Sequence, residues 1–501
     1  MRLLHPRKLA ALGVSTGVLA LAACGGGAGA GADAGLPEGA AYVPADTVVF
    51  VSLRTDFASE QWQTVEELVA RFPSGQEAVA SLLDEIEQDG VDLEQDVKPA
   101  LGPEVDIAVL DLPVGEDTPP MVLLTKPTDP GKLEALLTRS GEAPAWVVND
   151  GWYFIAESQE ILDRARSFES PLADEPVFAD TLERLEGDPL ARVFVNGDGL
   201  LAAVADAAAG KAPGLDLGAF GVGAFDGAAA GITAEGQGVR IQGVALSEEG
   251  PEPEPFDDTL AQLAPADALA YAAFGGADES LRELMDMVGS QTPDFDTALA
   301  QAQLALGISV EDDLLPIFSG PSAVWVRPGA TIPELTLVLS PDDPDKALVT
   351  LDKLTAGLGF LATMSEDEEA PVTGTESIAG IEATTLAFGD VTLYYAAVDD
   401  HVVVTTAASA IESLVADGAS LADSPAFQEA AQAAGLPDET TAILYVDIEN
   451  AFGALEDAGA LDGSPAENAD VLANAGSLDY LLLYGTGTAG EARVDGFLGI
   501  G

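Results

Sequence analysis

The chain repeats one sequence pattern, and this repetition restricts its fold more than any other feature of the sequence. The tripeptide Pro-Ala-Asp precedes an apolar segment at residues 44–46 and again at 265–267. Four more matches follow in the same order, and the last is Arg-x-x-Gly, beginning at Arg240 and at Arg493. The matched positions are 221 residues apart at the first element and 253 apart at the last. Such ordered recurrence predicts two tandem copies of one folding unit, the second with an insertion.

Each copy has the same order of expected elements. The apolar segment 47–53 is rich in β-branched residues and predicts a strand, and residues 62–72 have the periodicity of an amphipathic helix. A hairpin is expected around residues 149–151, Asn-Asp-Gly, because these residue types tolerate positive φ. Hairpins dominate and regular β-α-β alternation is missing. The sequence therefore predicts an α+β fold of two tandem related domains, each a mainly antiparallel sheet with packed helices.

Composition places the expected boundaries between these parts. Gly and Ala dominate after residue 24, alternating Glu and Pro occupy 247–258, and a second acidic stretch with Pro and Gly lies in the insertion. The expected parts are a signal peptide at 1–23, a flexible Gly/Ala tether at 24–40, a first repeat domain at 41–246, a Glu/Pro linker at 247–258, and a second repeat domain at 259–501 whose acidic insertion lies near 365–376.

The first residues have the order of an export signal. Three basic residues lie among the first eight, the apolar run 9–23 is too short to span a bilayer, and the only cysteine of the chain, Cys24, follows it. This arrangement resembles the lipobox of bacterial lipoproteins, which implies cleavage before Cys24 and acylation of its thiol. An ordinary secretory signal with an unrelated cysteine is the alternative. The expected location is the cell membrane, lipid-anchored on the extracytoplasmic face.

The charge balance limits the partners of this protein. Asp and Glu number 85 against 20 Lys and Arg, so the formal net charge is -65 and a polyanion such as nucleic acid would be repelled. The apolar fraction of 48% predicts folded cores rather than disorder. Repulsion between so many carboxylates predicts a halophilic-type surface that suits a high-salt medium and binds cations only loosely.

Motifs that suggest catalysis have simpler explanations. The G-x-G-x-x-G pattern at 485–490 precedes a strand-like segment rather than a helix, so it predicts a hairpin turn. After cleavage His401 is the only histidine, and it is expected in a hairpin turn at the position of Gly151. Arg240 and Arg493 are expected to pair with neighbouring carboxylates. We therefore assign no catalytic residue, no metal ligand and no cofactor, and we expect a protein that is not an enzyme.

The Pro-Ala-Asp strand opening, the Asp-x-x-Pro element before Gly-Pro, and the hairpin followed by a helix resemble a family of bacterial secreted proteins known only as a domain of unknown function. The resemblance implies an exported or membrane-anchored α+β protein and supplies no activity. The expected function is a non-catalytic surface protein that binds a partner or organises the envelope. A solute-binding lipoprotein of a transporter and a carboxylate-based hydrolase are the alternatives.

Overall fold

The computed structural model describes most of the chain after residue 34. The described residues are 35–77, 79–80, 91–112, 118–139, 144–202, 226–247, 253–291, 295–329, 333–364, 371–389, 391–416, 418–457 and 471–501. They belong to two compact units. Unit 1 comprises the chain up to Pro253 with Ala469–Leu478 and Gly485–Gly501, and unit 2 comprises Glu254–Asn468 with Asp479–Tyr484. Cys24 and the expected signal peptide lie outside the described residues.

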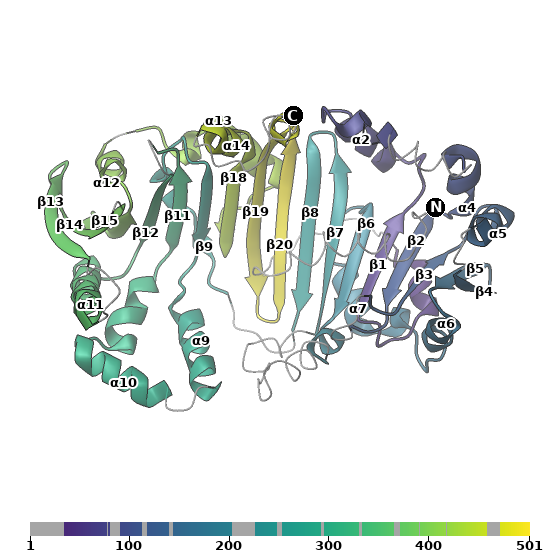
Figure 1. The fold of residues 1–501 in the computed structure, drawn as a ribbon, viewed down its shortest axis with the longest axis horizontal. Helices are drawn as coiled ribbons and strands as arrows, with labels where there is room; N and C mark the ends of the chain where they lie inside the picture. The colour runs from purple at the N-terminus through teal and green to yellow at the C-terminus, as the bar shows by residue number, and fades with distance from the viewer. Residues whose placement is uncertain are drawn as a thin grey trace. The chain divides into compact units, whose positions relative to one another are not determined.

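Unit 1 is built on an antiparallel sheet in the order β4-β5-β3-β2-β1-β6-β7-β8-β20 (Figure 1). Its strands are β1 (Val49–Arg54), β2 (Glu104–Val109), β3 (Met121–Thr125), β4 (Ala145–Asn149), β5 (Trp152–Ala156), β6 (Ala191–Asn196), β7 (Gly227–Glu235), β8 (Gly238–Leu246) and β20 (Glu491–Ile500). Its helices are η2 (Glu38–Tyr42), α2 (Glu60–Val69), η3 (Leu93–Val97), α4 (Lys98–Ala100), α5 (Pro130–Arg139), α6 (Gln159–Ala165), η4 (Leu172–Asp174) and α7 (Pro176–Leu182).

Unit 2 contains a sheet in the order β13-β14-β15-β16-β12-β11-β10-β18. Its strands are β9 (Phe256–Asp257), β10 (Ala270–Phe274), β11 (Ser322–Arg327), β12 (Glu334–Leu339), β13 (Val372–Ile378), β14 (Ile381–Phe388), β15 (Val391–Val398), β16 (His401–Thr405), β17 (Glu439–Thr440), β18 (Ala442–Asp447) and the middle of β19 (Leu478–Thr488). Its helices are η6 (Leu260–Gln262), α9 (Asp278–Gln291), α10 (Phe295–Leu306), η7 (Val310–Leu314), η8 (Leu315–Phe318), α11 (Pro344–Met364), α12 (Ala408–Val415), η9 (Leu421–Asp423), α13 (Pro425–Ala434) and α14 (Ile448–Asp457).

The two units share one strand order, which confirms the duplication and the α+β class. Strands β4-β5-β3-β2-β1-β6 of unit 1 correspond to β15-β16-β12-β11-β10-β18 of unit 2. Even an isolated bridge recurs, between Pro44 and Pro171 in one unit and between Pro265 and Ser420 in the other. The pairing registers therefore assign each strand residue of one unit to its counterpart in the other.

Local turn chemistry follows the sequence. The hairpin β4–β5 turns at Asp150 and Gly151 with φ of 50° and 83°, and the hairpin β15–β16 turns at Asp399 with φ of 51°. The pattern at 485–490 forms the end of β19 and the turn into β20, with Gly490 at φ 80°, so the hairpin prediction is confirmed. Asp and Gly adopt this backbone region more readily than other residues.

Four segments differ from their expected form or their expected domain because burial or strand pairing places them. Gly39 and Ala40, placed in the flexible tether by sequence, are buried in unit 1. Phe256 and Asp257, at the end of the expected linker, form β9 and pair with β17. Residues 372–376 of the acidic insertion lie in β13, which pairs with β14, whereas 365–370 lie outside the described residues. Strand β20, expected in the second domain, pairs with β8 of unit 1.

Helices α6 and α7 cover one face of the unit 1 sheet and form its main core. Phe178 of α7 packs edge-on against Phe50 and Phe194, with ring centroids 5.7 and 5.0 Å apart. Tyr42 of η2 reaches the same core and lies 5.7 Å from the Trp152 ring. The N-terminal segment is therefore part of the folded unit rather than an appendage.

Candidate functional site

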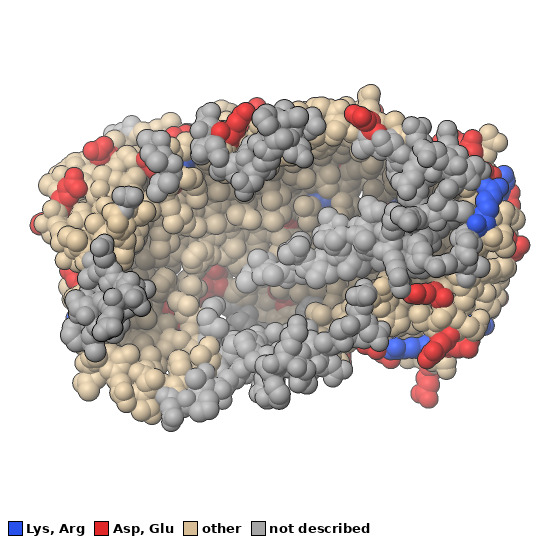
Figure 2. Space-filling model, in the orientation of Figure 1, with Lys and Arg blue, Asp and Glu red and all other residues tan. Residues whose placement is uncertain are grey.

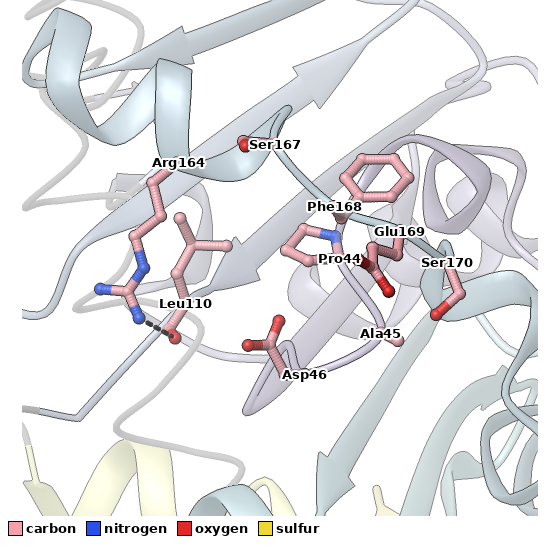
Figure 3. A pocket seen from close by; sticks show the side chains of 9 residues that line it. All are labelled: Pro44, Ala45, Asp46, Leu110, Arg164, Ser167, Phe168, Glu169 and Ser170. Atoms are coloured by element: carbon pink, nitrogen blue, oxygen red, sulfur yellow. Dashed lines mark hydrogen bonds between the residues drawn. The ribbon is translucent and has the colours of Figure 1, made fainter.

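A pocket of about 250 Å³ lies beside the Pro-Ala-Asp turn of unit 1 (Figure 3). The turn is closed by the Thr47 side chain, whose hydroxyl donates to the Pro44 carbonyl oxygen at 2.7 Å, and the Ala45 N–H donates to the Ser170 carbonyl oxygen at 3.1 Å. The repeated motif thus builds one wall, and the loop after α6 builds the other. The lining residues are Pro44, Ala45, Asp46, Leu110, Arg164, Ser167, Phe168, Glu169 and Ser170.

Charged groups of both signs face this pocket. The Arg164 guanidinium lies at one end, where Nη2 donates to the Leu110 carbonyl oxygen at 3.1 Å and to Asp111 Oδ2 at 3.4 Å. Figure 3 shows the carboxyl groups of Asp46 and Glu169 away from that end. A small ligand that carries a cationic group would find carboxylates here, and one that also carries an anionic group would find the guanidinium.

Unit 2 carries an ion pair at the corresponding place. Asp267 occupies the position of Asp46, and Arg327 occupies the position of Leu110. Arg327 Nη2 lies 2.9 Å from Asp267 Oδ2. Because Leu110 offers no charge in unit 1, Asp46 faces the pocket instead.

A second feature of unit 1 is a row of buried polar side chains across three strands. Ser52 of β1 lies between Asp106 of β2 and Arg192 of β6 in the pairing register. All three are 7% exposed or less. The corresponding residues of unit 2 are all apolar and buried, namely Ala273, Ala323 and Ile443. The fold therefore does not require polar groups at these positions.

Asp106 is the most constrained member of this row. Its side chain is fully buried, and neither carboxylate oxygen has a hydrogen-bond partner of acceptable geometry among the described residues. Burial, and then the negative charge of Glu104, raise the pKa of Asp106 well above its usual range, although the Ser52 hydroxyl and the Gly39 N–H act in the opposite direction. A buried carboxyl group of this kind favours its neutral form.

Arg192 faces the same region but makes its contacts elsewhere. Its Nη1 donates to the Gly35 carbonyl oxygen at 2.7 Å, and Nη2 lies 3.7 Å from Asp188 Oδ1. Burial and the positive charge of Arg54 lower the pKa of Arg192. The guanidinium therefore ties the N-terminal segment to the sheet.

The residues singled out by sequence are dispersed. Arg240 pairs with Glu235 at 2.5 Å, and Arg493 Nη2 lies 4.0 Å from Glu186 Oε1, so the carboxylate pairing expected for both is confirmed. His401 is not in the turn: it begins β16 opposite Val398, because the hairpin turns one residue earlier than the sequence alignment implies.

His401 is half-buried, its Nδ1 lies 3.0 Å from Ser340 Oγ, and burial lowers its pKa.

The buried polar row, formed by Ser52, Asp106 and Arg192, was not predicted from the sequence. Its signal in the sequence was the replacement of these residues by apolar ones in the second copy.

The described residues contain neither a metal-binding cluster nor a membrane-spanning helix. No group of three or more His, Cys, Asp and Glu side chains there is arranged to hold a metal ion. No helix in the same ranges is long and apolar enough to cross a membrane. In Figure 2 acidic side chains are scattered over the visible face, whereas Lys and Arg are visible at only a few places.

The fold and these sites define an internally duplicated α+β protein with antiparallel sheets. The chain belongs to the family described as "Protein of unknown function (DUF3352)", whose model matches residues 9–145 and 145–478. This match confirms membership of an uncharacterised family in two tandem segments. No curated protein matches the chain.

Among solved structures, the chain is similar to crystal forms of TP0453. Form I is 14% identical over 46% of this chain and 73% of TP0453, with a TM-score of 0.22. Form III is 12% identical over 50% of this chain and 95% of TP0453, with a TM-score of 0.23.

Proposed function

We propose that this protein is a lipid-anchored, non-catalytic protein of the extracytoplasmic surface that binds a partner or organises the envelope. The observation that carries the proposal is the position of Cys24, the only cysteine, directly after an export-type apolar run. Two or more acyl chains on this residue would hold the chain stably at a membrane.

The packing of the N-terminal segment supports a short anchor. Gly35 accepts a hydrogen bond from Arg192 of the unit 1 sheet, and eleven peptide steps separate Cys24 from Gly35. Eleven residues span at most about 40 Å when fully extended. Unit 1 would therefore stay within that distance of the lipid headgroups, which suits a protein that acts at the membrane surface.

Metabolic labelling with a fatty acid analogue tests the anchor. The wild-type chain should carry the label and partition with membranes, whereas Cys24→Ala should lose the label and move to the soluble fraction. Ala28→Ser, four residues further along, is the matched control and should behave like the wild type. Equal labelling and equal membrane partition of Cys24→Ala would refute the proposal.

The pocket at the Pro-Ala-Asp turn favours a second candidate, a solute-binding lipoprotein of a transporter. A ligand with a cationic group suits Asp46, because the Arg327 guanidinium contacts the equivalent Asp267 in unit 2. Thermal shift against amino acids, peptides, sugars and metal ions separates the two functions. Stabilisation by a cationic solute at micromolar concentration, lost in Asp46→Asn but kept in Asp267→Asn, would favour the solute receptor. No stabilisation by any of these probes would favour the first function.

A further inference from the structure

The segment Gly35–Tyr42, here called the N-terminal clasp, lies directly over the buried carboxyl group of Asp106. A Cβ atom added to Gly39 would stand 2.0 Å from Asp106 Oδ2. The clasp is held by the Arg192 contact to Gly35 and by the Glu38 N–H, which donates to Glu104 Oε1 at 2.9 Å. Residue 39 must therefore lack a side chain for the clasp to close over this carboxyl group.

The second unit shows the same arrangement without the carboxyl group. Leu260 stands at the position of Gly39, Ala261 at that of Ala40, and Ala323 at that of Asp106, and all three are buried. The counterparts of Gly39 and Asp106 in unit 2 are thus both apolar and buried. An acid at this strand position is therefore special to the first copy, whereas Asp258 of unit 2 lies elsewhere and accepts hydrogen bonds from the Tyr271 hydroxyl and the Ala261 N–H.

The charges around Asp106 offset its burial only in part, although Asp106 acts to raise the pKa of Arg192. Glu104 is two residues away on the same face of β2, Arg54 lies opposite Glu104 on β1, and Arg192 stands on β6. Arg54 and Arg192 both form ion pairs with Oδ1 of Asp188. Glu38 of the clasp adds one more negative side chain. Asp106 therefore has an acidic neighbour on its own strand, while the nearby guanidinium groups are paired with another carboxylate.

We propose that the protonation state of Asp106 controls the clasp: Gly35–Tyr42 stays packed on β2 while the carboxyl group is neutral and detaches when it ionises. Detachment would let water reach the carboxylate, whose oxygens have no hydrogen bond of acceptable geometry among the described residues in the closed form. The direction follows from linkage, since a group whose pKa is raised in the closed state weakens that state as pH rises above its ordinary value. Each unit of difference in pKa corresponds to a tenfold change in the closed-to-open ratio.

Opening would alter the reach of the anchor, a consequence that rests on the proposed function. The clasp has eight residues, and releasing them adds at most about 28 Å to the distance between Cys24 and the sheet. The clasp itself needs no lipid, so it is testable apart from the anchor.

Thiol accessibility in the full chain carrying Cys24→Ala tests the proposal, because no other cysteine is present. A reporter is added as Ala40→Cys in the clasp, and its reaction with a maleimide is followed from pH 5 to pH 9. Ala261→Cys, at the same repeat position of unit 2, is the matched control and corrects for the pH dependence of the thiol itself. This control chain also carries Asp258→Asn, because burial raises the pKa of the Asp258 carboxyl group, which accepts a hydrogen bond from the Ala261 N–H.

We expect the Ala40→Cys rate, divided by that of Ala261→Cys, to rise at least tenfold between pH 5 and pH 9. Asp106→Asn should abolish this rise. Asp106→Ala, which copies the residue of unit 2, should do the same and serves if Asp106→Asn fails to fold. A rate ratio that stays constant with pH, or rises equally in the Asp106 variants, would overturn the proposal. A failure of Cys24 labelling would instead affect only the proposed anchor.

Discussion

Substitution of Gly39 by alanine should destabilise unit 1, because the new methyl group would collide with Asp106. The added Cβ would lie 2.0 Å from Oδ2 and 2.9 Å from Cγ, where about 3.4 Å is needed for ordinary contact. Asp106 is fully buried and its backbone is held in β2 between β1 and β3, so the carboxyl group cannot turn into solvent. Either the clasp or the strand must move.

Overpacking of this kind costs about 1–3 kcal/mol of unfolding free energy. Asp106→Ala restores the space, so the double variant Gly39→Ala/Asp106→Ala should recover most of the loss. The coupling energy between the two substitutions should therefore be close to the cost of Gly39→Ala alone. Gly236→Ala, where an added Cβ meets nothing within 4 Å, is the control and should change stability by less than about 0.5 kcal/mol.

Urea unfolding followed by tryptophan fluorescence measures these effects. In a Trp325→Phe background the remaining tryptophans, Trp62, Trp146 and Trp152, all belong to unit 1, so the signal reports that unit. Wild-type stability of Gly39→Ala, or a double variant no more stable than Gly39→Ala, would refute the steric reasoning.

Three further outcomes are expected. Arg493→Gln should destabilise unit 1 by about 3–5 kcal/mol in urea unfolding, since Arg493 is 5% exposed and its charge opposes the rise that burial causes in the pKa of Asp495. Arg240→Gln, at a more exposed ion pair, should cost about 1 kcal/mol or less, and equal losses for the two variants would contradict this prediction. His401 should titrate below 6.5 by NMR because burial disfavours its charged form, so stability should fall as pH drops below about 6.5, and His401→Gln should remove that loss. The urea midpoint should be higher in 1 M than in 0.1 M salt, because the screening length falls from about 10 to about 3 Å and weakens the repulsion between carboxylates. Equal midpoints would show that the acidic surface does not make stability depend on salt.

Features set by short stretches of sequence were predictable. The hairpin at Asp150–Gly151 follows from residue types that tolerate positive φ, and the helix expected at 62–72 is found as α2. The repeat gave the fold class, because two copies of one pattern must form two copies of one structure. The sequence placed His401 in the hairpin turn, but His401 is the first residue of β16, one position beyond the turn. Aligning the two turn sequences does not specify which residue is the first to pair in the strand.

The candidate sites depend on contacts between distant parts of the chain. The pocket joins the turn at Pro44 to the loop ending at Ser170, and the buried row joins Ser52, Asp106 and Arg192. Sequence alone does not say which strands become neighbours, because strand pairing is decided by packing of the whole sheet.

By itself, the sequence determined the duplication, the α+β class and the acidic composition, and it predicts the anchor at Cys24. These properties depend on composition, periodicity and local turn chemistry, which act over a few residues. Only the tertiary structure placed Gly39 over Asp106, removed that carboxyl group from water, and added β20 to the sheet of unit 1. The physical reason is that burial and the electrostatics that follow from it arise only when distant strands pack together.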